Sequence, residues 1–257
     1  MTTTIIGIDC ATKPSKIGLA LAHYDGRRAH LLECRPGGTD ARPAITEWIQ
    51  SAGGPALLAL DAPLGWPSAL GAALNHHKAG DLLEGQPDIL FSRETDRTVW
   101  REVGKRPLEV GANLIARTAH SALTLLRDVR GQTGLAINLA WSPERPEQVT
   151  AIEVYPAATL AALHPNQVRY GHPPADREST LGSLLQAFPS ISGVETHRQM
   201  LLKNEHVFDA FVCVLAGLDF LEGRAQRPND LELARREGWI WVRSRGSMAD
   251  QINPARA

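Results

Sequence analysis

Apolar runs bounded by polar and turn residues predict three strands at the start of the chain, over about residues 3–9, 16–23 and 29–35. The first strand ends on an acid, Asp9, and a short bend of Thr, Lys, Pro and Ser residues follows it. The sequence YDGRR supplies the turn between the second and third strands. An aspartate at the end of a buried strand either begins the turn or is held at the sheet edge to bind a ligand.

A helix is expected near residues 40–51, with Pro43 in its first turn. The sequence GGP then breaks the chain before PALLALD, a continuous apolar run that ends at Asp61. Such a run is typical of a central strand covered on both faces. The order strand, strand, strand, helix, strand predicts a mixed sheet, in which an antiparallel meander is followed by a crossover to a parallel neighbour.

The remaining pattern predicts an α/β protein with one further central strand. Apolar residues at helical spacing indicate a helical insertion after the fourth strand, at about 66–135. VTAIEVYP (149–156) reads as the fifth strand, and EHVFDAFVCVLAGLDFLEG as a strongly apolar helix. A short helix and an edge strand are expected in DLELARREGWIWVR. We therefore expect a single domain over residues 1–243, and a flexible tail over 244–257.

Composition and charge narrow the class of protein. The chain has 257 residues and a formal net charge of −1, which argues against a general nucleic-acid coat. Its three cysteines form no CxxC pair, so neither a disulfide framework nor a thiolate zinc site is indicated. No apolar segment reaches the length needed to span a bilayer, and the N-terminus lacks signal-peptide features. A cytoplasmic protein with no membrane partner is expected.

Four acids stand out because each interrupts or ends an apolar segment. Asp9 and Asp61 end strands, and their carboxylates would emerge at one sheet edge if those strands are parallel neighbours. Asp209 is the only charge between Val207 and Leu218, on an apolar helix. Glu153 lies near the end of the fifth strand. Singly, each is more commonly a turn former, a helix cap or a salt-bridged core residue. Together they suit Mg²⁺ or Mn²⁺, which prefer carboxylate and water ligands.

Five segments carry a family resemblance. In order, they are GIDCATKPSKIGLALA, LALDAPLGWP, FSRETDRTVWRE, IEVYPAA and VFDAFVCVLAG. They resemble the signature blocks of a domain-of-unknown-function family of predicted nucleases with a ribonuclease-H-like fold. The resemblance implies a mixed five-stranded sheet flanked by helices. It also gives Asp9, Asp61 and Asp209 the role of metal ligands, and Glu153 that of a ligand or water-positioning base.

Substrate contacts are predicted from charge and from aromatic side chains. Arg93, Arg97 and Arg101 recur at a spacing of four, which suits either phosphate binding or a solvated face paired with neighbouring acids. The resemblance at RETDR favours a functional role for Arg93, Asp96 and Arg97. Lys13 is in the loop after Asp9, and Trp66 is the tryptophan best placed to stack on a base.

These observations lead to three hypotheses. The first is a metal-dependent nuclease that hydrolyses DNA or RNA by a two-metal carboxylate mechanism. The second is a phosphoryl-transfer ATPase or kinase of the actin-like superfamily, because GIDCAT also resembles its first phosphate loop; no second loop of that kind occurs. The third is a non-catalytic nucleic-acid-binding module. No GxSxG, GxxxxGK[ST] or HExxH motif is present, and no histidine is predicted to be catalytic.

Overall fold

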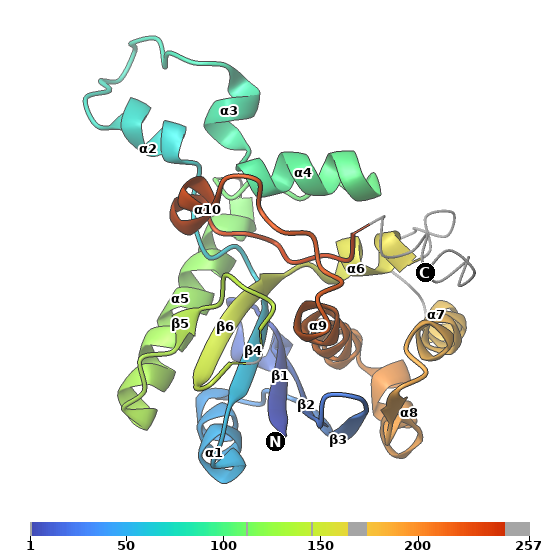
Figure 1. The fold of residues 1–257 in the computed structure, drawn as a ribbon. Coiled ribbons are helices and arrows are strands. Elements are labelled where there is room, and N and C mark those ends of the chain that lie inside the picture. The colour runs from blue at the N-terminus through green and yellow to red at the C-terminus, as the bar shows by residue number, and fades with distance from the viewer. Residues whose placement is uncertain (1, 112, 145, 164–173, 245–257) are drawn as a thin grey trace.

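The structure is a computed structural model that describes residues 2–111, 113–144, 146–163 and 174–244. Its centre is a mixed sheet of seven strands in the order β5-β6-β4-β1-β2-β3-β7 (Figure 1). The strands are β1 (Thr3–Asp9), β2 (Gly18–Tyr24), β3 (Ala29–Pro36), β4 (Ala56–Asp61), β5 (Asn138–Leu139), β6 (Val149–Val154) and β7 (Ile191–Ser192).

The pairing of the strands follows the predicted meander and crossover. Strand β1 pairs antiparallel with β2, and β2 antiparallel with β3. On its other side β1 pairs in parallel with β4, and β4 in parallel with β6. The chain thus has the mixed α/β sheet that the sequence predicts.

The predicted count of five strands is wrong. Strands β5 and β7 add one short parallel partner to each edge of the sheet. Each has two residues, too few to show the period-two alternation on which strand prediction depends. The expected edge strand near residue 240 is reduced to isolated bridges, Glu153 with Ile240 and Ala225 with Arg243.

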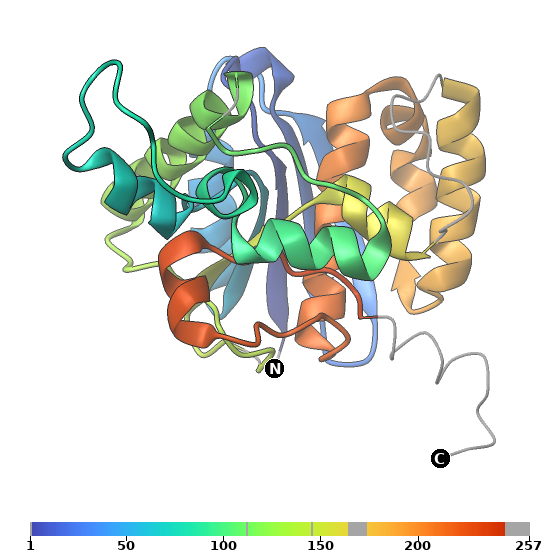
Figure 2. The same cartoon turned by 90° about the horizontal axis from the view of Figure 1, so that it is seen from above.

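Helices cover both faces of the sheet. They are α1 (Arg42–Ala52), α2 (Ser68–Leu74), α3 (Pro87–Phe91), α4 (Glu94–Val103), α5 (Asn113–Thr133), α6 (Pro156–Leu163), α7 (Pro174–Ala187), α8 (Val194–Lys203), α9 (Glu205–Leu221) and α10 (Leu231–Glu237), with a 3₁₀ turn η1 at Pro14–Lys16. Helices α1 and α5 lie on one side of the sheet, and α7, α8 and α9 on the other (Figures 1 and 2).

Strand β1 carries apolar residues on both of its faces, and helices cover both faces of the sheet. Ile6 and Ile8 pack in the core with α1 and α5, whereas Ile5 packs in the core that contains α9. Alternate residues of a strand point to opposite faces, so a continuous apolar run fills both cores.

Two glycines bring α9 into direct contact with the sheet. A Cβ atom at Gly7 would overlap the carbonyl oxygen of Ala210, and one at Gly18 would overlap that of His206. The absence of side chains at these positions lets the backbone of α9 approach β1 and β2 closely. This contact places the first turns of α9 beside the end of β1.

Four helices, α2 to α5, occupy the chain between β4 and β5, where the sequence predicts a helical insertion. Helices α2 and α3 lie away from the sheet (Figure 1). Helix α4 returns to pack Val99 and Val103 against α6 and against Ile240 and Val242. Among the described residues, no helix has the length and apolar character needed to cross a membrane. The predicted tail, apart from Ser244, is outside the described residues.

Candidate functional site

The site begins with the pair of aspartates at the ends of β1 and β4. These strands are parallel, and Asp9 and Asp61 are partners in their register. Neighbouring strands are about 4.8 Å apart, so the two residues are held side by side at the carboxyl edge of the sheet. The sequence predicts this juxtaposition from two apolar runs that each end on an acid, and the strand pairing confirms it.

Helix α9 adds a third carboxylate. Its N-terminus is fixed by Asn204, whose side chain accepts hydrogen bonds from the backbone N–H groups of His206 and Val207. The close approach at Gly7 and Gly18 then holds the first turns of α9 against β1 and β2. Asp209 is half-buried there, and its negative charge contributes to the raised pKa of Asp61.

Asp61 lies in a strongly anionic environment. Burial raises its pKa well above the ordinary value, and the negative charges of Asp9, Asp209 and Glu153 raise it further. In the described part of the chain the Asp61 carboxylate has no hydrogen-bond donor or cationic partner. Such a group is stable only if it is protonated or if a cation is bound nearby.

Asp9 has a partner that the sequence interpretation missed. The Nδ1 atom of His206 lies 2.7 Å from Oδ2 of Asp9. Burial raises the pKa of Asp9, while the hydrogen bond and charge of His206 oppose that rise. The hydrogen bond to Asp9 in turn raises the pKa of His206 above its ordinary value. The available signal was the spacing in EHVFDAF, because residues 206 and 209 share a helix face.

Glu153 is engaged by an arginine. Its Oε1 is 2.7 Å from Nη2 of Arg93, and its Oε2 is 3.0 Å from Nη1 of Arg93 and 2.9 Å from the backbone nitrogen of Leu64. Burial raises the pKa of Glu153, and the Arg93 guanidinium counteracts that effect. The structure therefore places Glu153 in an internal ion pair, and its role as a ligand or water-positioning base stays a prediction.

Arg93 and Asp96, which are predicted to bind substrate, lie in the same buried cluster. Arg93 is only 1% exposed and donates to Glu153, to Asp96 and to the carbonyl of Glu237. These five hydrogen bonds use all five N–H donors of a guanidinium group. None remains for a phosphate, and Asp96 is buried in the same cluster.

The other predicted substrate contacts are dispersed. Arg97 donates to the carbonyls of Asp88 and Ser92, so its guanidinium is used at the end of α3. Arg101 is exposed and contacts Glu102 and Thr98. Lys13 is exposed in the loop after β1, and Trp66 is 37% exposed.

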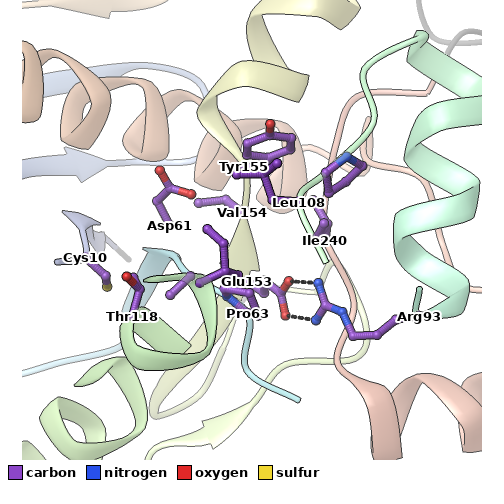
Figure 3. Close-up of a pocket in the computed structure, with 13 residues that line it drawn as sticks. Cys10, Asp61, Pro63, Arg93, Leu108, Thr118, Glu153, Val154, Tyr155 and Ile240 are labelled. Atoms are coloured by element: carbon purple, nitrogen blue, oxygen red, sulfur yellow. Dashed lines mark hydrogen bonds and ion pairs between the residues drawn. The ribbon is translucent and has the colours of Figure 1, made fainter. Parts of the chain in front are cut away.

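A cavity of about 230 Å³ opens beside Asp61, at the carboxyl ends of β4 and β6. Figure 3 shows its lining, with the Asp61 carboxylate and the Arg93–Glu153 pair on opposite sides of the view. Of the six residues predicted to bind substrate, Arg93 alone is among the described residues that line it. The cavity therefore adjoins the carboxylates, and Arg97 and Arg101 lie outside its lining.

The possible metal donors near Asp9 and Asp61 are carboxylate oxygens, together with the imidazole of His206, which is paired with Asp9. Burial raises the pKa of the nearby thiols Cys10 and Cys213 well above the ordinary value, so they remain neutral and are poor metal ligands. Hard cations such as Mg²⁺ and Mn²⁺ match such oxygens. Within the described ranges, no group of three or more His, Cys, Asp and Glu side chains is already arranged to hold a metal ion. One oxygen of Asp9 faces His206 in this conformation.

Comparison with known proteins identifies a family. The family model described as "Protein of unknown function (DUF429)" matches residues 7–233. The matched span includes Asp9, Asp61, Glu153 and Asp209. No curated protein matches the chain.

Proposed function

The chain belongs to this family of proteins of unknown function, and we propose that it is a metal-dependent nuclease that hydrolyses phosphodiester bonds in a nucleic acid. Asp9, Asp61 and Asp209 are the proposed ligands of Mg²⁺ or Mn²⁺. The observation that carries the proposal is the register pairing of Asp9 with Asp61, next to α9. Two carboxylates at that spacing repel each other, and a divalent cation between them removes the repulsion.

The fold adds support. The five central strands have the order β3-β2-β1-β4-β6, with β2 antiparallel to its neighbours. This is the mixed arrangement that the ribonuclease-H-like interpretation of the sequence anticipates. We include that fold assignment in the proposal and regard β5 and β7 as additions at the sheet edges.

The chain's own residues would position the reaction. When bound, two such ions activate a water molecule and stabilise the leaving oxygen of the phosphodiester. His206 holds Oδ2 of Asp9 and leaves Oδ1 to face a ligand, since Oδ1 has no hydrogen-bond partner in the described part of the chain. Neither carboxylate oxygen of Asp61 has a hydrogen-bond partner in the described part of the chain, so both are available to a ligand.

Two features of the site limit access of water and fix its geometry. Asp9 is 8% exposed, and Asp61 lines the cavity. The Arg93–Glu153 pair joins the start of α4 to β6, so it supports the wall beside Asp61. We therefore treat Glu153 as a positioning residue.

The test is cleavage of labelled single-stranded and duplex DNA and RNA in the presence of Mn²⁺, Mg²⁺ or chelator. The wild-type protein should cleave at least one substrate with metal and none with chelator. Asp61→Asn should abolish cleavage. Asp81→Asn, which changes an exposed aspartate between α2 and α3, is the matched control and should leave cleavage unchanged.

Binding without cleavage under all these conditions would support the non-catalytic module instead. Hydrolysis of ATP that depends on Asp9 and Asp61, with no cleavage of nucleic acid, would support the phosphoryl-transfer alternative. Either result would overturn the nuclease proposal.

A further inference from the structure

We propose that the cavity beside Asp61 receives one unpaired base of the substrate, so that the nucleic acid acted on is single-stranded or locally unpaired there. The inference rests on the proposed nuclease function and defines its substrate class. It is carried by the position of the cavity, the chemistry of its walls and its size.

The cavity shares a wall with the proposed metal site. Asp61 at the end of β4 lines it, as do Val154 and Tyr155 at the end of β6. Ligands of open α/β sheets bind outside the carboxyl ends of parallel strands, which is where this cavity is located. A base in the cavity is joined to its phosphates through a single sugar, so an adjoining phosphate would be brought to the carboxylates.

The walls suit an uncharged ring and disfavour a phosphate. Pro63, Leu108, Val154 and Ile240 supply aliphatic surface (Figure 3). Ile115 also lines the cavity. Such a lining matches the apolar faces of a base, as in other small-molecule sites.

The charged groups of the lining leave no cation available for a phosphate. Arg93 is the single basic residue among the described lining residues, and its five donors are occupied by Glu153, Asp96 and Glu237. Asp61 would repel an anion. The phosphate must therefore remain outside the cavity, on the side of the metal ions.

Neutral polar groups are present for the edges of a base. Tyr155 is half-buried, and its hydroxyl makes no hydrogen bond within the described residues. Burial raises its pKa to about 12, so the hydroxyl stays protonated and neutral. Thr118 donates to the carbonyl of Leu114 and keeps its oxygen as an acceptor.

The volume of the cavity limits the number of bases that it can hold. Its volume of about 230 Å³ is below the roughly 300–1,000 Å³ of pockets that enclose drug-sized ligands. One ring system matches this scale, whereas a base pair with its two backbones does not. A base in duplex would have to leave the stack to enter, as it does in enzymes that flip their target nucleotide.

The test compares two neighbouring positions on α5. Ile115→Phe adds bulk at a residue that lines the cavity, and Leu114→Phe makes the same change at an exposed residue outside the lining. The probe is a single-stranded oligonucleotide carrying 2-aminopurine, titrated in chelator so that binding is measured apart from metal and cleavage. Ile115→Phe should weaken binding on the order of tenfold, the scale of one base contact, and Leu114→Phe should not.

A second variant distinguishes a loss of binding from a loss of folding. Leu108→Ser changes a cavity residue that is 67% exposed, so it should fold and still weaken binding. An otherwise identical duplex and an oligonucleotide with abasic positions should both bind more weakly than the single strand.

The outcomes separate the two proposals. Equal binding by Ile115→Phe, Leu108→Ser and wild type, or equal cleavage of intact and abasic strands, would overturn the base site and leave the nuclease proposal standing. Loss of base binding in both cavity variants, with no metal-dependent cleavage by wild type, would support the base site and overturn the nuclease proposal.

Discussion

Replacing Arg93 by alanine tests whether the buried ion cluster is structural. Arg93 is 1% exposed, and its removal would leave the carboxylates of Glu153 and Asp96, 3% and 4% exposed, without their cation. Breaking a buried ion pair by removing one partner typically costs about 3–5 kcal/mol. For a chain of this size each kcal/mol corresponds to roughly 2–4 °C, so the melting midpoint should fall by roughly 6–20 °C.

The assay is thermal and urea unfolding in chelator, so that metal binding makes no contribution. Arg101→Ala, on the exposed side of the same helix, is the control and should cost less than about 1 kcal/mol. The double variant Arg93→Ala/Glu153→Gln should be more stable than Arg93→Ala, because glutamine removes one uncompensated charge. A melting midpoint of Arg93→Ala within about 2 °C of that of wild type would show that the cluster does not stabilise the fold.

Three further predictions concern the aspartates and α9. Burial and neighbouring acids raise the pKa of Asp61 above its ordinary 3.8. The folded state therefore binds the proton more tightly than the unfolded state, and metal-free stability should fall as pH rises above about 4. Urea titrations at a series of pH values in chelator should show a larger loss of stability in wild type than in Asp61→Asn, in which Asp9 still titrates; parallel profiles would contradict the prediction. The pKa of His206, followed by NMR, should drop in Asp9→Asn because the hydrogen bond that raises it is weakened; an unchanged value would exclude Asp9 as the cause. Gly18→Ala should destabilise by about 1–3 kcal/mol because its Cβ meets the backbone of α9. Gly182→Ala, which meets open space in α7, should be neutral or slightly stabilising in the same melts; equal effects would contradict the close contact.

The sequence predicts the centre of this fold because its signals there are local. The strands that end at Asp9 and Asp61 are apolar runs with clear boundaries, and the order of elements leaves few ways to pair them. Strands β5 and β7 have no such signal, since two residues carry no period. They form because β6 and β3 present backbone N–H and C=O groups at the edges of the central sheet, with which β5 and β7 can pair.

The side-chain partners at the site depend on distant parts of the chain. Arg93 and Glu153 are 60 residues apart, and Asp9 and His206 are 197 apart. A spacing of four places Arg93, Arg97 and Arg101 in one row, but it does not tell which of them is buried. Arg93 precedes α4 as its N-cap, where it turns inward rather than along the exposed face.

The most direct test of the metal site is a crystal structure of the protein grown with Mn²⁺, with anomalous scattering measured near the manganese edge. We predict an anomalous peak within about 2.0–2.4 Å of carboxylate oxygens from both Asp9 and Asp61, with Asp209 turned toward it. The peak should be absent from crystals of Asp61→Asn. A wild-type map with no peak at saturating Mn²⁺, and with Asp9 still paired to His206, would contradict the proposed metal site.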